Sequence, residues 1–180
     1  MERREPAPIW AAVFGRSELR FVFNEAGILN LTTFHAIYPR SPDREFAMAL
    51  TACLNSPVVQ HRAKLQHRVY GGGLLKYEPK DLLDIQVPNL RKVCRPTLSR
   101  LAQSLITLDR AAKSGSANQI SEARNCLNNA VTMAAEEAVS QASLPAPEHP
   151  LELGPLWARR THRDDPALSL GAPHETPAVE

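Results

Sequence analysis

The chain has 180 residues, 43% of them hydrophobic, and a formal net charge of +2 at pH 7. This length allows one domain with a packed core and some residues beyond it. Three widely spaced cysteines exclude a disulfide framework and a zinc knuckle, and the short apolar run at the start excludes an export signal or membrane span, so we expect a soluble, cytoplasmic protein.

The two halves of the chain differ in charge. From Phe14 to Arg95, 12 Lys or Arg residues stand against 7 Asp or Glu residues, whereas from Pro96 to Glu180 the numbers are 7 and 10. A basic first half suits a polyanion such as nucleic acid. An excess of this size is also common on ordinary protein surfaces, so charge alone does not decide the partner.

The first elements are predicted to be strands. Alternating apolar residues indicate strands at Ile9–Phe14 and Leu19–Phe23, joined by a hairpin connection. The β-rich run Ile28–Tyr38 changes phase in its middle, which predicts a bend or bulge. The polar residues that would gather at this bend are Asn30, Thr32, Thr33 and His35.

Two helices should follow these strands. Ser41-Pro42-Asp43 is a helix-start signal, and Ser56-Pro57 supplies an N-cap and a first-position proline for a second helix. In that second helix His61, Lys64 and Arg68 recur at helical spacing and predict a basic stripe beside an apolar one. The stripe would end next to a glycine turn.

The glycine turn is the centre of the chain. Gly71, Gly72 and Gly73 lack a Cβ atom and let the backbone approach another surface closely. After them the pattern predicts a short strand at 74–77, a single helical turn at 79–83 and a second short strand at 84–87, which ends before Pro88.

The last ordered part should be a helical hairpin. Leucines and alanines at 3–4 spacing predict a helix from Pro96 and another after Ser114-Gly115-Ser116. From Leu144 onward prolines recur without periodicity, which predicts a disordered tail. The expected fold is therefore α+β: a small mixed β-sheet with packed helices over 7–95, an antiparallel helical hairpin over 96–141 and a disordered tail over 142–180.

The sequence carries no convincing catalytic constellation. The three glycines lack the GxGxxG spacing and the Gly-Lys-Ser/Thr ending of phosphate-binding loops. His61 and His67 do not have the i, i+4 spacing of paired metal ligands, and no Gly-x-Ser-x-Gly elbow occurs. We therefore expect no catalytic residue and no metal site in this chain.

A family resemblance is carried by the run from Arg68 to Pro88. Its Gly-Gly-Gly, Leu-Lys, Glu-Pro, Leu and Val-Pro elements resemble the signature that closes the target-recognition region of type II adenine-specific (N6) DNA methyltransferases. Arg20–Asn24, Asn30–His35 and Leu54–Ser56 are similar to the same region in the same order. The resemblance covers roughly Ile9 to Val139.

The resemblance also shows what is missing. Methyltransferases of this kind carry a Phe-x-Gly-x-Gly loop for S-adenosylmethionine and an (Asn/Asp/Ser)-Pro-Pro-(Tyr/Phe/Trp) loop for the flipped adenine, and neither occurs here. The resemblance thus implies a recognition part without a cofactor of its own. Its expected partners are double-stranded DNA and a methyltransferase catalytic domain or subunit that binds S-adenosylmethionine, with no membrane partner.

The expected DNA-binding residues fall into three groups. Basic side chains would contact phosphates, polar side chains would contact base edges, and the glycine backbone would admit a phosphate. Each group also has a purely structural alternative, namely a solvated face, a satisfied bend or a tight turn. In that order the groups are Arg62, Lys64, Arg68 and Lys76; Asn30, Thr32, Thr33 and His35; and Gly71, Gly72 and Gly73.

Two other functions remain compatible with the sequence. The chain could be a recognition half related to type I restriction specificity subunits, in which a recognition domain is followed by helices that dock protein. It could also be a helical interaction module that binds no nucleic acid, in which case the basic stripe is only a solvated face.

Overall fold

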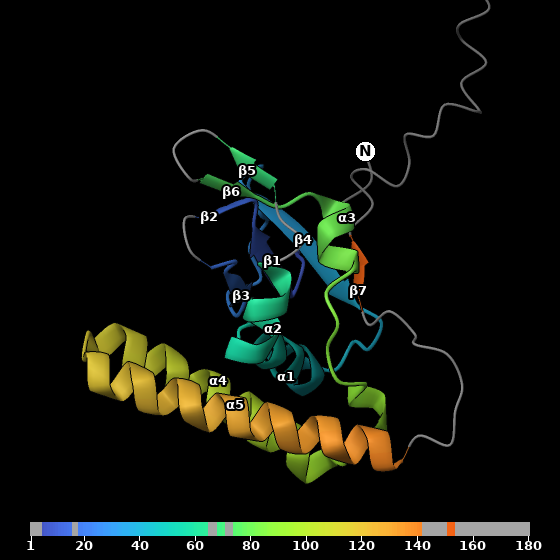
Figure 1. Cartoon of the computed structure of the whole chain (residues 1–180). Coiled ribbons are helices and arrows are strands. Elements are labelled where there is room, and N and C mark those ends of the chain that lie inside the picture. Colours follow the sequence, from blue (N-terminus) through green and yellow to red (C-terminus); the bar gives the residue numbers. More distant parts are fainter. Residues whose placement is uncertain (1–4, 16–17, 65–67, 71–73, 142–150, 154–180) are drawn as a thin grey trace, which may run out of the picture.

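The computed structural model describes residues 5–15, 18–64, 68–70, 74–141 and 151–153. Within these ranges the strands lie at one end of the molecule and the long helices α4 and α5 at the opposite end, with α1 and α2 between them (Figure 1). The predicted α+β class is confirmed. Among the described helices, none is long and apolar enough to cross a membrane.

The larger sheet contains four of the described strands, in the order β3-β1-β4-β7. Every neighbouring pair is antiparallel, and Ile9 lies opposite both Phe23 and Ile37. The predicted alternation is present in β1, where Ile9 and Ala11 are buried and the residues between and after them are partly exposed. The strands are β1 (Ile9–Ala12), β3 (Phe21–Phe23), β4 (Phe34–Pro39) and β7 (Leu151–Leu153).

The smaller sheet has the order β2-β6-β5 and is also antiparallel. Its described strands are β2 (Phe14–Gly15), β6 (Leu74–Lys76) and β5 (Arg68–Tyr70). Gly15 has no room for a side chain, because a Cβ atom there would lie 2.7 Å from the Glu18 carbonyl oxygen. The strands therefore divide into two antiparallel sheets, a partition that the alternation pattern did not predict.

Strand β5 corrects the sequence-based expectation for this part of the chain. The second helix, α2, spans only Pro57–Ala63, and Arg68 lies on a strand instead of on that helix. Val69 and Tyr70 have high strand propensity, and β6 offers them a partner across the glycine turn. The basic stripe expected from His61, Lys64 and Arg68 is therefore not a stripe on one helix.

The helix starts agree with the capping signals. The Asp43 side chain accepts a hydrogen bond from the Glu45 amide and caps α1 (Arg44–Leu54), and Ser56 caps α2. Pro79 opens α3 (Pro79–Leu83). Proline at a first helical position loses nothing, because its amide would have no intrahelical partner there.

The expected second strand at 84–87 is wrong. Ile85 is buried and Gln86 is exposed, as in a strand, but no described strand pairs with this segment. The alternation here reflects Ile85, which belongs to the apolar core, between two exposed neighbours, and not a paired strand. A short 3-10 helix, η2 (Leu90–Lys92), follows it.

The helical hairpin consists of α4 (Arg95–Ser114) and α5 (Ala117–Ser140). Gly115 ends α4 with a φ of +70°, a conformation that residues with a Cβ atom rarely adopt. Leu101 and Leu127 are fully buried and belong to the same apolar cluster as residues of α1 and the larger sheet. The hairpin therefore contributes to the core that supports the sheets.

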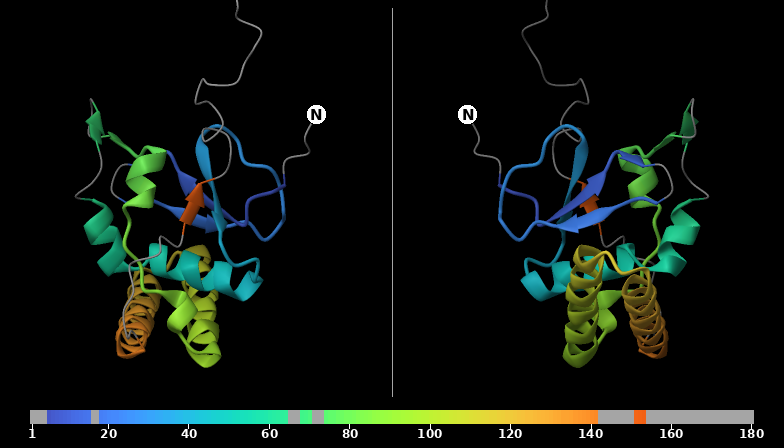
Figure 2. Two further views of the ribbon diagram at one scale, coloured as in Figure 1. Left: turned by 90° about the vertical axis from the view of Figure 1, so that its right-hand side faces the viewer. Right: turned by 90° about the vertical axis from the view of Figure 1, so that its left-hand side faces the viewer.

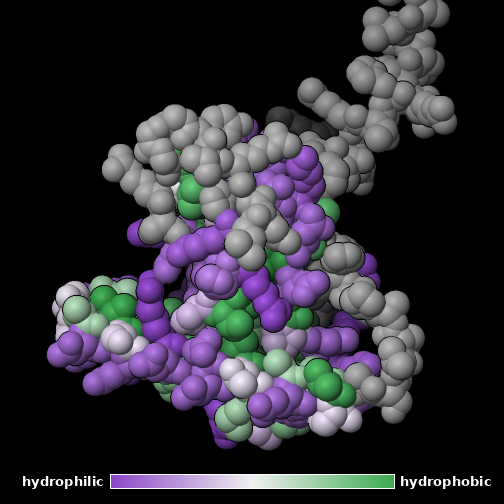
Figure 3. Space-filling model, viewed as in Figure 1, coloured by the Kyte–Doolittle hydropathy of each residue, from purple (hydrophilic) through white to green (hydrophobic). Residues whose placement is uncertain are grey.

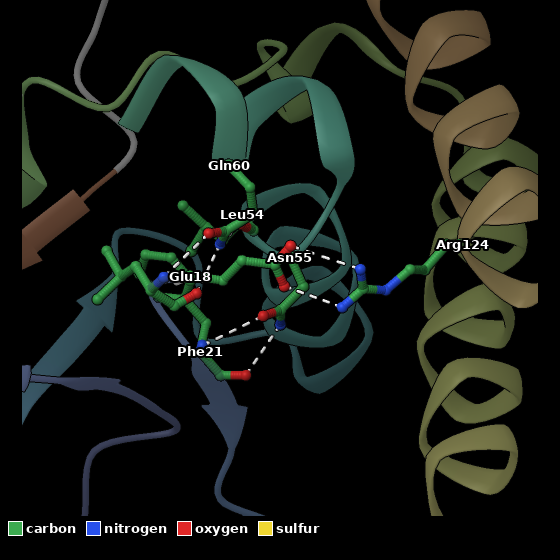
Figure 4. Close-up of polar contacts among 7 residues, drawn as sticks. Glu18, Phe21, Leu54, Asn55, Gln60 and Arg124 are labelled. Atoms are coloured by element: carbon green, nitrogen blue, oxygen red, sulfur yellow. Dashed lines mark hydrogen bonds and ion pairs between the residues drawn. The ribbon is translucent and has the colours of Figure 1, made fainter. Parts of the chain in front are cut away.

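The outer edge of β3 is covered by two amide side chains (Figure 4). Gln60 accepts from the Leu19 amide at 3.1 Å and donates to the Leu19 carbonyl at 2.7 Å. Asn55 makes the same pair of contacts with Phe21, at 3.2 and 2.8 Å. These side chains take the place of a further strand, so α1 and α2 are held against the larger sheet.

Candidate nucleic-acid interface

The C-terminal end of α2 presents the first predicted phosphate contacts. Arg62 is exposed in the last turn, and Lys64 is the half-buried C-cap residue. Val59 and Ala63 of the same helix are buried, whereas Val58 is 40% exposed. Cations at this position also interact favourably with the negative end of the helix dipole.

The smaller sheet aligns the other two predicted phosphate contacts. The register places Arg68 on β5 opposite Lys76 on β6, and Lys76 opposite Phe14 on β2. Phe14 is a large apolar residue that is 47% exposed. The sequence analysis did not name it as a candidate contact.

The glycine turn connects these two strands. Gly71, Gly72 and Gly73 follow β5 and precede β6, but they lie outside the described residues. Their predicted phosphate contact therefore stays a prediction.

The four predicted base-reading residues have different environments. The Asn30 amide donates to the Phe34 carbonyl at 2.9 Å, and His35 Nε2 donates to the Tyr77 carbonyl at 3.0 Å. Both side chains thus bind nearby backbone carbonyls. This is the structural role that the sequence analysis gave as the alternative to base contact. Thr32 and Thr33 are exposed. Base contact by any of the four stays a prediction, and the two threonines have the more accessible side chains.

Val13 brings the two groups of candidates together. This residue lies between β1 and β2, donates its amide to the Thr33 carbonyl at 3.0 Å and accepts from the Tyr77 amide at 3.0 Å. The end of the 24–33 loop and the end of β6 therefore meet at one residue. Backbone hydrogen bonds therefore bring the segments that carry Thr33 and Lys76 together at Val13, whereas α2 lies between the strands and the helices α4 and α5 (Figure 1).

Buried Tyr77 carries no negative charge. Burial raises the pKa of its hydroxyl above the usual value, and the nearby Asp81 carboxylate raises it further. The hydroxyl is therefore neutral at physiological pH.

A cavity with mostly apolar walls lies beside α2. It has a volume of about 460 Å³ and lies between α2, the segment around Pro88 and the last turns of α5. Apolar side chains gather on this face between α2 and α5 (Figure 3). Only Arg62 of the predicted DNA-binding residues lines it. Across the described ranges no group of three or more His, Cys, Asp or Glu residues could hold a metal ion.

Comparison with known proteins assigns the chain to a family. Residues 7–131 match the family model described as the C-terminal domain of the type II methyltransferase M.Eco57I. The chain is 43% identical over 89 residues to the type II methyltransferase M.AccI of Acinetobacter calcoaceticus. The aligned region covers 46% of this chain and 16% of M.AccI.

A second relative is also a type II methyltransferase. The chain is 29% identical over 90 residues to the type II methyltransferase M.XamI of Xanthomonas campestris pv. amaranthicola, which covers 50% of this chain and 16% of M.XamI. The matched region is thus about one sixth of each relative. No solved structure matches the chain. Because the family model covers more than half of its residues, the chain belongs to the family of the C-terminal domain of the type II methyltransferase M.Eco57I.

Proposed function

We propose that this chain is the DNA target-recognition part of an adenine-specific type II DNA methyltransferase. The observation that carries the proposal is the match of residues 7–131 to the C-terminal domain of the type II methyltransferase M.Eco57I. The sequence contains neither the S-adenosylmethionine loop nor the adenine loop that the resemblance requires of a catalytic part. Catalysis and cofactor binding are therefore assigned to a separate domain or subunit, and the cytoplasm is the compartment in which the DNA would be met.

The proposed DNA contacts come from α2, the smaller sheet and the loop before β4. Arg62, Lys64, Arg68 and Lys76 would contact phosphates and position the duplex, together with the backbone at the three glycines. Thr32 and Thr33 would contact base edges from the adjoining loop. A methyltransferase that extracts its target base from the duplex needs a second surface that holds the DNA, and this part would supply it.

A salt titration of binding to duplex DNA tests the proposal. Each neutralised phosphate contributes about −0.9 to the slope of log K against log salt concentration, so four contacts give about −3.6. The double variant Arg62→Ala/Lys64→Ala should reduce the magnitude of the slope by about 1.8. The measurement is fluorescence anisotropy of a labelled duplex at several salt concentrations.

The matched control removes two exposed cations from α4, which carries none of the proposed contacts. Arg100 and Arg110 are exposed on α4, and Arg100→Ala/Arg110→Ala should leave the slope unchanged. A flat salt response of the wild-type chain would favour the helical interaction module instead. An equal loss in both double variants would show that binding follows total charge and not the proposed interface.

A further inference from the structure

The loop between β3 and β4 exposes a group of aliphatic side chains. Ile28 is 56% exposed, Leu29 57% and Leu31 74%. Contiguous exposed aliphatic residues of this size indicate a surface that another macromolecule covers. We call residues 26–33 the aliphatic loop.

The aliphatic loop has a defined conformation. Asn24 donates to the Ile28 carbonyl at 2.8 Å and accepts from the Ile28 amide at 3.2 Å, while Asn30 donates to Phe34. Gly27 allows the turn with a φ of +61°. Because the loop is already ordered by these contacts, a partner that binds it has little ordering entropy to overcome.

The chemistry of the aliphatic loop favours protein over DNA as its partner. The eight residues from Ala26 to Thr33 contain no charged side chain. A DNA-contacting surface obtains most of its affinity from Lys and Arg beside phosphates, and this segment offers none. An uncharged aliphatic surface instead matches the apolar centre of a protein interface.

The position of the loop indicates which protein would bind it. Asn24 donates its side-chain amide to the Ala7 carbonyl and its backbone amide to the Pro8 carbonyl, both at 2.8 Å. The loop is thus attached to the segment that leads into β1, on the side of the larger sheet away from α2 and α3 (Figure 2). The family domain begins at residue 7 and is a C-terminal domain, so in proteins with that arrangement the preceding polypeptide enters beside this loop.

We infer that the aliphatic loop is the docking surface for the methyltransferase catalytic part that the proposed function requires. The inference rests on the proposed function, since it takes that catalytic part as the partner. A catalytic part joined at residue 7 would be held next to Ile28, Leu29 and Leu31 at high effective concentration. Thr32 and Thr33 at the end of the loop would then lie between the docked part and the DNA.

Hydrogen exchange in a hybrid protein tests this inference. The hybrid joins the M.AccI polypeptide that precedes its matched region to the full 180-residue chain. Amides 28–31 should exchange at least about tenfold more slowly in the hybrid than in the isolated chain. Leu31→Asp should remove this protection while leaving the thermal unfolding of the isolated chain unchanged, because Leu31 is mostly exposed.

Val139→Asp is the matched control, because Val139 on α5 is also 74% exposed. It should leave the loop protection intact. Equal exchange rates in hybrid and isolated chain, or equal loss of protection in both variants, would overturn the inference. If the hybrid does not purify as a folded monomer, the same M.AccI segment is added in trans to the isolated chain, and absence of loop protection there also counts against docking.

Other partners and the proposed function give distinguishable results. Protection of the loop by duplex DNA alone, or protection that grows with the concentration of the isolated chain, would overturn the inference in favour of DNA or a second copy. If the loop is protected in the hybrid but DNA binding does not depend on salt, the docking inference stands and the proposed DNA recognition is overturned. If DNA binding depends steeply on salt but the loop is not protected in the hybrid, the proposed DNA recognition stands and the docking inference is overturned.

Discussion

At the scale of single residues, two amide side chains complete the edge of a sheet. Gln60 is only 4% exposed and satisfies the amide and carbonyl of Leu19 together with the Leu54 carbonyl at 2.8 Å. Asn55 does the same for Phe21. An edge strand with free backbone groups invites pairing with another chain, and these contacts prevent it.

Replacing Gln60 should therefore be costly. In Gln60→Leu the side chain keeps its approximate size, but three buried backbone groups lose their partner. Leaving such groups unsatisfied costs about 2–4 kcal/mol in the free energy of unfolding. The measurement is urea denaturation followed by circular dichroism.

Gln86→Leu is the control, because Gln86 is exposed. Its free energy of unfolding should differ from that of the wild type by less than about 0.5 kcal/mol. Similar losses in both variants would mean that the Gln60 contacts are not what stabilises this edge.

At the scale of elements, the first turns of α1 and α4 are joined by charged groups. Arg95 on α4 contacts the Asp43 carboxylate at 2.5 Å and the Glu45 carboxylate at 2.8 Å. Ser99 adds a hydrogen bond to Glu45. The Arg95 guanidinium, followed by the Glu45 backbone amide, lowers the pKa of Asp43 below its ordinary value.

This lowered pKa predicts how the helix junction depends on pH. A carboxyl group whose pKa is lower in the folded state stabilises that state above its unfolded pKa, near 3.8, and the contribution disappears as pH falls through the folded value. Asp43→Asn keeps a helix cap but cannot titrate. The wild type should be more stable than this variant at pH 7, and the difference should vanish on acidification.

Unfolding midpoints measured between pH 7 and strongly acidic pH check this expectation. Glu25→Gln is the control, because Glu25 and its partner Arg44 are both largely exposed, and such pairs contribute little. A difference between wild type and Asp43→Asn that stays constant over the whole pH range would contradict the role given to the ion pair.

At the scale of the whole molecule, the sheets and the helical hairpin share one apolar core. Leu101 and Leu127 of the hairpin belong to the same buried cluster as Leu50 of α1 and Ile9 of β1. The sequence predicts a recognition module over 7–95 and a helical hairpin over 96–141 that packs on it. Because the two parts share a core, we expect them to unfold together.

Cooperative unfolding can be observed with two probes. In Trp157→Phe, Trp10 of β1 is the only tryptophan and reports on the sheet, while circular dichroism reports mainly on the helices. The urea midpoints of the two probes should coincide. Leu127→Ala should lower the free energy of unfolding by about 2–5 kcal/mol and move both midpoints together. Separate midpoints would show that the hairpin is an independent unit.

Local signals in the sequence determined most of the elements. The caps at Asp43 and Ser56, the proline at position 79 and the glycine at position 115 each act through neighbouring backbone groups, so their effect can be predicted without knowledge of the fold. The same holds for the long amphipathic helices. The family could also be predicted from the sequence, because the motif from Arg68 to Pro88 that carries the resemblance is one contiguous stretch.

Pairing between distant segments was decided only by the tertiary structure. Arg68 lies on a strand because β6 is available to pair with it, and the segment at 84–87 is no strand because it has no such neighbour. Asn30 and His35 are occupied by the Phe34 and Tyr77 carbonyls, and Val13 joins the two sheets. These contacts depend on which segments meet after the chain closes long loops, and periodicity within one segment carries no record of that.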